Sequence, residues 1–233
     1  MIILYNNGIT PLLPEQGSLG ASGDLIPLAH SALMLLGEGN VYDNGKIKKV
    51  ADVLKKLGMK KHSFLPKEAL SLINGTEVTT SRGAFALSGS RTLIYSAVRT
   101  TAALFEVLGA SKSCLDERIH DLKPHAGQKI VAGLLRKHLS GSKLCDNSRK
   151  VQDSYVIRCA PQIDRAIFGR IEDAVKTIET EMNSVTDNPL FFYKKNEAQA
   201  VSGGNFHAQS AAFALDSLGI ALVAFGRVSE RRI

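Results

Sequence analysis

The sequence has no tryptophan, and aromatic residues make up only 6% of it. The hydrophobic residues, 44% of the 233, are therefore mostly Leu, Ile, Val and Ala, which suit packed helices. With 22% charged residues, the composition is that of a soluble globular protein and excludes a disordered chain. The length is enough for one large domain or two small ones.

Cysteine is scarce, and its spacing excludes two common uses. Cys114, Cys145 and Cys159 lie far apart and form no Cys-x-x-Cys pair, so neither a disulfide framework nor a zinc site is indicated. The first ten residues lack the positively charged segment and the long apolar stretch of a secretion signal. We therefore expect reduced thiols and a cytoplasmic protein.

Two further absences bear on partners. The longest uninterrupted apolar run, near residues 218–225, is too short to span a membrane, so no membrane partner is predicted. The net charge is +7, but the lysines form short pairs such as Lys48-Lys49 without interleaved aromatic residues. No nucleic-acid-binding motif accompanies them, so they indicate a solvated basic face and no nucleic-acid partner.

Metal-ligand spacing is also missing. His30, His125 and His207 lie in separate parts of the chain, and no pair of histidines has the spacing of one helix face. We predict that no metal is needed.

Apolar periodicity predicts a mainly helical chain without internal repeats or low-complexity linkers. The apolar positions 25, 28, 29, 32, 33 and 36 indicate an amphipathic helix, with Asp24 at its N-cap and Gly37 just after it. Asn44-Gly45, within Val41–Ile47, is a strong hairpin signal. Further helices are predicted at about 50–57, at 76–109, from after Pro124 to near Gly141, from Pro161 to 182 and from about Phe206. Another helix is predicted to begin at Pro66, with Ser63 as its cap. An irregular stretch is expected at 141–162 and a short strand within 186–192.

The stretch "GSLGASGDLIPLAH", residues 17–30, raises the question of chemistry. A phosphate-binding loop needs a lysine after its last glycine, but Gly23 is followed by Asp24. A serine nucleophile elbow needs Gly-x-Ser-x-Gly, and this segment is one residue too short. A simple capped turn is the commonest structure for such a loop.

A third interpretation follows from the small size of Ala21, Ser22 and Gly23. Because glycine lacks a Cβ, its amide nitrogen can fold back onto the carbonyl two residues earlier. If Gly23 N attacks the Ala21 carbonyl and the Ser22 hydroxyl is eliminated, two waters leave. The product is an electrophilic imidazolone with an exocyclic methylene.

These residues resemble the signature of the histidine and aromatic amino acid ammonia-lyases. That family forms 4-methylideneimidazole-5-one (MIO) from such an Ala-Ser-Gly triplet. The variants "PLAH", "GNFH" and "RCAPQ" are most similar to the histidine branch. Six further blocks resemble the family in the family's order: "LINGTE" (72–77), "KPHAGQ" (123–128), "QDSYVIRCAPQ" (152–162), "NSVTDNPLFF" (183–192), "SGGNFHAQ" (202–209) and "SERRI" (229–233).

The resemblance implies a mainly α fold, a long-helix bundle of the ammonia-lyase (aspartase/fumarase-like) type with small β-hairpins in the loops. It implies elimination of ammonia from an α-amino acid, most similar to conversion of L-histidine to urocanate. MIO would form autocatalytically, with no metal or diffusible cofactor, and the assembly would be a homotetramer. The implied site residues are Ala21, Ser22, Gly23 and Tyr155 as catalytic groups, Asn74, Gln152, Arg158 and Phe206 around the substrate, and Asp24 as support for the loop.

The resemblance also implies missing parts. Family members carry an upstream tyrosine loop that supplies the catalytic base, and an acidic residue after the "SERR" block. We therefore expect residues 1–233 to be an internal portion of one lyase domain, with an MIO-loop region at about 1–75 and a long-helix core at about 76–233. We expect this chain alone to be inactive and to need complementing lyase segments. The alternatives are an aromatic (Phe or Tyr) ammonia-lyase, an aminomutase, or a remnant that acts only as a helical assembly module.

Overall fold

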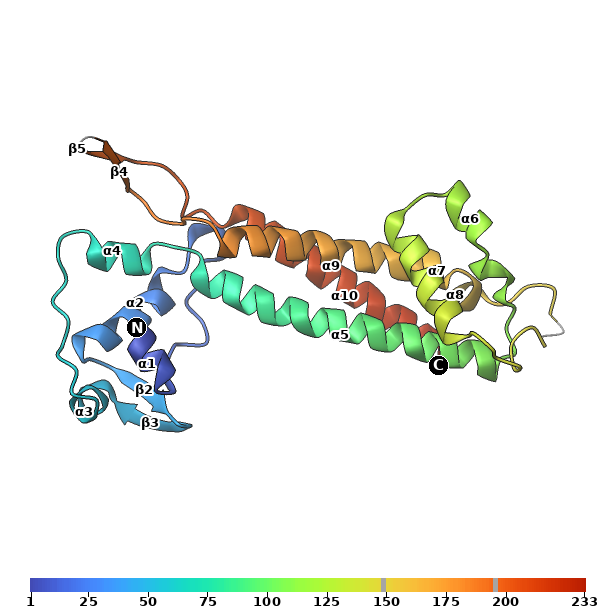
Figure 1. Cartoon of the computed structure of the whole chain (residues 1–233), viewed down its shortest axis with the longest axis horizontal. Helices are drawn as coiled ribbons and strands as arrows, with labels where there is room; N and C mark the ends of the chain where they lie inside the picture. The colour runs from blue at the N-terminus through green and yellow to red at the C-terminus, as the bar shows by residue number, and fades with distance from the viewer. Residues whose placement is uncertain (148–149, 195–196) are drawn as a thin grey trace. The chain divides into compact units, whose positions relative to one another are not determined.

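The computed structural model describes residues 1–147, 150–194 and 197–233, and the fold is mainly α-helical (Figure 1). The chain divides into two compact units, the first made of Met1–Arg82 with Thr180–Ala212 and the second of Gly83–Glu179 with Phe213–Ile233. The helices are α1 Ile2–Asn6, α2 Leu25–Leu36, α3 Val50–Lys56, α4 Glu68–Ile73, α5 Glu77–Val107, α6 Glu117–Leu122, α7 Ala126–His138, α8 Tyr155–Arg158, α9 Ala160–Met182 and α10 Gln209–Arg231, with 3-10 turns at Gly20–Ser22 and Lys112–Leu115.

The first unit is built around a small antiparallel sheet. Strand β2 (Asn40–Asp43) pairs with β1 (Ile9–Pro11) on one side and with β3 (Lys46–Lys49) on the other. The hairpin predicted at Asn44-Gly45 is confirmed, and both residues have the positive φ (51° and 79°) that a tight two-residue turn requires. Helices α1, α2 and α3 cover a core made of Leu4, Ile9, Met34, Val41, Val50, Val53 and Leu54.

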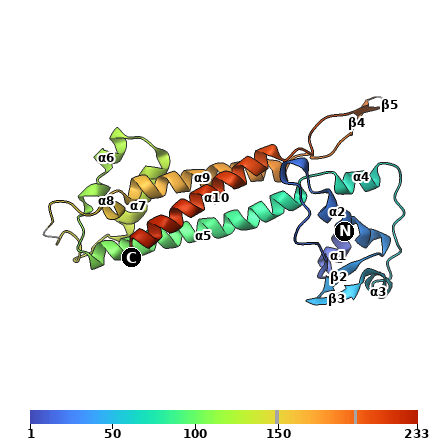
Figure 2. The same ribbon diagram turned by 180° about the vertical axis from the view of Figure 1, so that it is seen from behind.

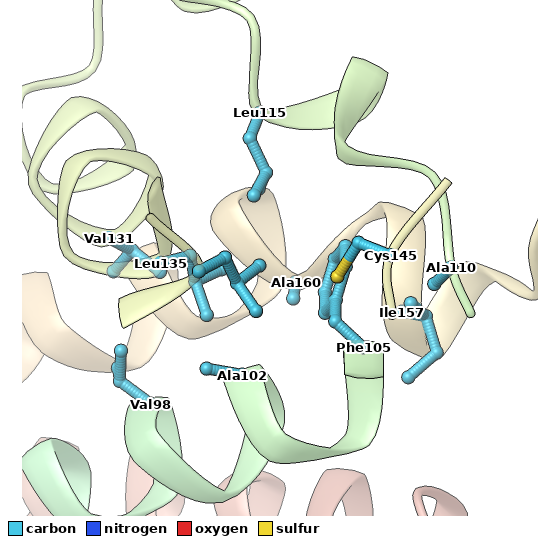
Figure 3. Close-up of a cluster of buried hydrophobic side chains, with 11 residues drawn as sticks. Val98, Ala102, Phe105, Ala110, Leu115, Val131, Leu135, Cys145, Ile157 and Ala160 are labelled. Atoms are coloured by element: carbon cyan, nitrogen blue, oxygen red, sulfur yellow. The ribbon is translucent and has the colours of Figure 1, made fainter. Parts of the chain in front are cut away.

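The second unit contains most of the three long helices. Helices α5, α9 and α10 run side by side in both views (Figures 1 and 2). At one end of these helices, α7 packs against α5 through Val131 and Leu135, which are fully buried with Phe105 (Figure 3). Burying a side chain as large as Phe105 contributes about 1.5–3 kcal/mol relative to leaving it in water.

A buried ion pair joins four helices of this unit. Arg232, just after α10, donates through Nη2 to Asp164 Oδ1 in α9 at 2.8 Å. Its Nη1 bonds the Thr101 hydroxyl in α5 at 2.9 Å, and its Nε bonds the carbonyl of Val156 in α8 at 3.1 Å. Both charged side chains are less than 10% exposed, so this pair is shielded from water.

Several predicted boundaries were wrong. Helix α4 begins at Glu68, and Pro66 and Ser63 lie before it, because Lys67 has a φ of 77° that a helix does not allow. Helix α6 follows the cap Asp116, a signal that the sequence reading overlooked.

Boundaries near the C-terminal half also differ from the predictions. Helix α10 begins at Gln209, three residues after the predicted start at Phe206. The strand predicted within 186–192 is β4, Leu190–Lys194, and it pairs with a second strand, β5, Glu197–Val201. The irregular stretch at 141–162 contains α8 and the start of α9, and two of its residues, 148 and 149, lie outside the described residues.

Helix α10 is longer than the uninterrupted apolar run from which no segment able to span a membrane was predicted. An 18-residue window within it has a mean hydropathy of 1.6 and is only 17% buried, so by length and composition this helix could cross a membrane. This helix was not identified from the sequence as a candidate span, because only the uninterrupted apolar run near residues 218–225 was considered. The core helices of soluble proteins pass the same test.

A buried histidine predicts a pH dependence of stability. His120 of α6 is 1% exposed, and its Nδ1 lies 2.9 Å from the amide nitrogen of Gln128 in α7. Burial lowers the pKa of His120 below its ordinary value of 6.5. The folded state therefore holds the neutral ring, and its stability is complete above the unfolded pKa.

We expect the free energy of unfolding to fall as the pH drops from about 7 towards 5, where the unfolded chain takes up the proton first. Urea titrations at a series of pH values measure this. The His120→Gln variant is expected to lose part of that slope, whereas the control His138→Gln, at an exposed position in α7, keeps it. An unchanged slope in His120→Gln would show that His120 does not carry the effect.

Candidate active site

The Ala-Ser-Gly triplet lies in a tight turn of the first unit. The 3-10 turn Gly20–Ser22 is closed by Gly23 N, which donates to Gly20 O at 3.0 Å. Leu19 N donates to Gly23 O at 3.1 Å, so the last residue of the triplet is also tied to the segment before it. Gly20 (φ 61°) and Gly23 (φ 97°) adopt conformations that residues with a side chain rarely enter. The two glycines therefore allow a turn this compact.

Asp24 anchors this turn to helix α5. It is 0% exposed and occupies the N-cap position of α2, as predicted, but its carboxylate makes no capping bond to α2 among the described residues. Instead it accepts from the backbone N and the hydroxyl of Thr79, both at 2.7 Å, and from the Ser18 hydroxyl at 2.5 Å. Thr79 is the third residue of α5, where backbone N–H groups have no acceptor within the helix. Asp24 thus caps α5 rather than its own helix.

The carbonyl of Ala21 is hydrogen-bonded to the segment before α10. Ala208 N donates to Ala21 O at 3.0 Å, and Ala208 directly precedes Gln209, the first residue of α10. Phe206 lies in the same segment and is half-buried. A Cβ placed on Gly23 would lie 3.6 Å from Phe206 O. The structure therefore brings the backbone of the Phe206 segment against the triplet. That the Phe206 side chain packs beside the ring of MIO stays a prediction.

Asn74 is joined to the triplet through its neighbour in sequence. Asp24 N donates to Gly75 O at 3.2 Å, and Asn74 Nδ2 donates to the carbonyl of Asn188 at 3.0 Å. The same carbonyl accepts from Lys67 Nζ at 3.1 Å. Lys67 also forms an ion pair with Asp187 at 2.7 Å, which lowers the pKa of that carboxyl although burial opposes the shift. This network fixes the position of the Asn74 amide.

The other predicted residues, Gln152, Tyr155 and Arg158, belong to the second unit. Tyr155 and Arg158 lie on α8, with the guanidinium carbon of Arg158 over the Tyr155 ring at 4.5 Å from its centre. Arg158 Nε donates to the carbonyl of Asp153 at 3.1 Å. Gln152 and Arg158 line a cavity of about 520 Å³, whereas Tyr155 is 69% exposed and is not among the residues that line it. Arg158 is therefore among the residues that line a cavity of this unit, with its guanidinium stacked on Tyr155.

Cys114 lines the same cavity. Burial, together with the nearby carboxylate of Asp153, raises the pKa of its thiol to about 11. The thiol therefore stays protonated at neutral pH and is a poor nucleophile. Cys114, Cys145 and Cys159 are all free thiols in this structure.

Four residues of the site were missed by the sequence reading: Ser18, Thr79, Lys67 and Asp187. Ser18 and Asp187 lie inside blocks that were recognised, and Thr79 and Lys67 lie close to "LINGTE". Their side chains bond to residues outside the triplet, so their positions within or near the motifs did not predict a role in the site. The first unit has a cavity of about 950 Å³, which is lined by Lys67 but by none of the predicted site residues.

The histidines make local contacts. His30 Nδ1 lies 2.9 Å from Ile26 O, and His207 Nδ1 accepts from Gln209 N at 3.3 Å. Within residues 1–147, 150–194 and 197–233, no group of three or more His, Cys, Asp or Glu side chains could hold a metal ion. That no metal is needed stays a prediction.

Comparisons with known proteins agree with this architecture. The family described as aromatic amino acid lyases matches residues 1–233. A histidine ammonia-lyase of Symbiobacterium thermophilum is 42% identical over all of this chain and 46% of its own length. The crystal structure of histidine ammonia-lyase from Trypanosoma cruzi superposes with a TM-score of 0.86 and 40% identity, covering 98% of this chain and 42% of that one.

A tyrosine aminomutase from Streptomyces globisporus superposes with a TM-score of 0.90 and 35% identity, covering 99% of this chain and 47% of that one. The chain spans about half the length of the curated relatives it matches. Its long helices and few short strands are those of the ammonia-lyase and aminomutase fold. From the match over its whole length and from its fold, the chain belongs to the aromatic amino acid lyase family.

Proposed function

We propose that this chain carries the MIO-forming part of an ammonia-lyase that converts L-histidine to urocanate. The observation that carries the proposal is the turn at Ala21–Gly23. Its small residues, its two positive-φ glycines and the buried Asp24 beside it form a segment suited to cyclisation. The similarity to proteins named histidine ammonia-lyase supports the choice of substrate.

The residues around the triplet fit the formation of MIO. Attack by Gly23 N on the Ala21 carbonyl carbon places negative charge on Ala21 O, and the N–H of Ala208 already donates to that oxygen at 3.0 Å. A preorganised backbone donor of this kind stabilises a developing oxyanion by about 3–4 kcal/mol in enzymes. Gly23 lacks the Cβ that would hinder its nitrogen.

Other residues of the chain would serve the substrate. When formed, MIO supplies an electrophilic methylene carbon that enables ammonia to leave. Arg158 has the planar guanidinium that binds a carboxylate with two parallel hydrogen bonds, and it faces a cavity. Asn74, whose amide is fixed by Asn188, would hydrogen-bond near the substrate, and Phe206 would pack beside the ring of MIO. Gln152 and Tyr155 would line the site, with Tyr155 among the catalytic groups.

We further propose that the protein is cytoplasmic and works as a homotetramer without a metal or a diffusible cofactor. The free thiols support a reducing compartment. Exposed apolar side chains on α5 and α10, among them Phe85, Phe213 and Ile220, support association with further protein surface.

A chimera tests the reaction and the substrate together. Residues 1–233 replace the matching span of the Symbiobacterium thermophilum enzyme, and the chimera is assayed with L-histidine, L-phenylalanine and L-tyrosine. We expect ammonia and urocanate from L-histidine, and at least a hundredfold lower rate when the chimera carries Ser22→Ala. The parent enzyme is the positive control.

Other outcomes would contradict parts of the proposal. Ammonia released from L-phenylalanine or L-tyrosine but not from L-histidine would assign the chain to the aromatic lyases. A β-amino acid product would assign it to the aminomutases, whose solved structures superpose equally well. A folded chimera that is inactive on all three substrates would favour a remnant without catalytic function.

A further inference from the structure

The Ser18 hydroxyl connects the two sides of the Ala-Ser-Gly triplet. It accepts from Gly20 N, the residue before the triplet, at 3.1 Å. It donates to Asp24 Oδ1, the residue after the triplet, at 2.5 Å. One side chain thus holds both flanking residues, although Ser18 itself is exposed and belongs to no core.

The acceptor of this bond is itself fixed to helix α5. Asp24 Oδ1 also accepts from Thr79 Oγ1 at 2.7 Å, and Asp24 Oδ2 accepts from Thr79 N at 2.7 Å. The Ser18 and Thr79 hydroxyls therefore both donate to Asp24 Oδ1, and their oxygens lie 3.4 Å apart. Hydrogen bonds to a buried carboxylate are stronger than bonds between neutral groups. Ser18 therefore ties the entry of the turn to a rigid part of the fold.

We propose that Ser18 is a positioning residue for the cyclisation of Ala21, Ser22 and Gly23. The proposal rests on the proposed function, because it concerns the formation of MIO. The hydroxyl keeps Gly20 and Asp24 close, and so keeps the intervening backbone in the compact turn from which Gly23 N reaches the Ala21 carbonyl carbon.

The reaction that Ser18 assists is a double dehydration. A bond forms between Gly23 N and the carbonyl carbon of Ala21, and the Gly23 proton passes to the carbonyl oxygen. That oxygen then leaves as water with the proton of Ser22 N, and a C=N double bond forms between the Ala21 carbon and Ser22 N. Ser22 then loses its Cα proton and its hydroxyl as a second water, which leaves the exocyclic methylene. Neither step needs an oxidant or a reductant.

The geometry explains why a bond across the turn should accelerate the first step. Gly23 N now donates to Gly20 O, and it must move from that acceptor onto the neighbouring Ala21 carbon. Holding the two ends of the turn reduces the conformational freedom that is lost when the ring closes. Without the Ser18 hydroxyl, the amide of Gly20 and the carboxylate of Asp24 are no longer joined.

Timed mass spectrometry tests the proposal. The full chain is synthesised in a cell-free reaction, synthesis is stopped, and the intact mass is followed until two waters have been lost. We expect Ser18→Ala to cyclise roughly tenfold to a hundredfold more slowly, the loss expected for one bond to a charged acceptor. Ser18→Thr, which keeps the hydroxyl, is expected to restore most of the rate. Ser63→Ala, at an exposed serine of the same unit, is the matched control and is expected to cyclise like the wild type.

Folding is measured in parallel by urea titration of each variant. If Ser18→Ala proves unstable, Ser18→Cys provides a nearly isosteric side chain with a weak donor, and its rate is expected to fall between those of Ala and Thr. Equal rates for the wild type and the folded Ala or Cys variants would overturn the positioning role, as would a slow Ser18→Thr variant. A wild-type chain that never loses water would overturn the proposed function itself, and this inference with it.

Discussion

The Ser22→Ala chain is expected to have its full calculated mass, whereas the wild-type chain is lighter by two waters. Ser22 supplies both the β-hydroxyl that leaves and the Cβ that becomes the methylene carbon. With alanine at this position the second dehydration has no leaving group, and the ring formed by the first step lacks the conjugation that would retain it. The expected effect is therefore complete loss of the mass difference.

The substitution is expected to leave the fold intact, because the Ser22 side chain is exposed and is not part of a hydrophobic core. Surface substitutions of this kind change stability by about 0.5 kcal/mol or less. Intact-mass measurement on purified protein provides the result, and Ser63→Ala is the control that should keep the two-water difference. A Ser22→Ala chain that is still two waters lighter would show that the loss arises elsewhere.

Replacing Arg232 by methionine is expected to lower the free energy of unfolding by about 3–5 kcal/mol. Arg232 donates hydrogen bonds to Asp164 Oδ1, the Thr101 hydroxyl and the carbonyl of Val156 in a site shielded from water. Burial raises the pKa of Asp164 even though Arg232 opposes that shift. Without the guanidinium, Asp164 is left as a buried carboxyl without its ion-pair partner. Urea unfolding at neutral pH measures the loss.

Two controls separate the buried pair from a general loss of charge. Arg91→Met removes the partner of Glu172 in an ion pair whose side chains are 49% and 32% exposed, and it should cost about 1 kcal/mol or less. The double variant Asp164→Leu/Arg232→Met replaces both charges by apolar groups and should recover most of the lost stability. If the double variant is as unstable as Arg232→Met, the cost lies in the lost bonds to Thr101 and Val156 rather than in an unpaired carboxyl.

The sequence predicted the elements that depend on local signals. Helix α2 was predicted by its apolar stripe and by Gly37, and the hairpin at Asn44-Gly45 by a residue pair that is strongly preferred in such a turn. The start of α4 was missed because it depends on the positive φ of Lys67. Lys67 also pairs with Asp187, which is 120 residues away in sequence, and a contact this distant leaves no local pattern.

In the candidate site, too, some features could be predicted from sequence motifs and others depend on distant contacts. Ala21, Ser22, Gly23, Asn74 and Phe206 lie in blocks that the family resemblance identified, and the first unit brings these blocks together. The partner of Asp24 could not be predicted, because N-cap spacing indicated α2 and the carboxylate instead caps α5. Which helix end an acid caps depends on how distant segments pack.

If the proposed function is correct, this chain converts its own Ala21, Ser22 and Gly23 into MIO. Trypsin should release residues 1–46 as one peptide, because Lys46 is the first Lys or Arg in the sequence. Tandem mass spectrometry of that peptide is expected to show a loss of two waters confined to Ala21–Gly23. A peptide of full calculated mass from folded protein, or a loss located outside these three residues, would contradict the account.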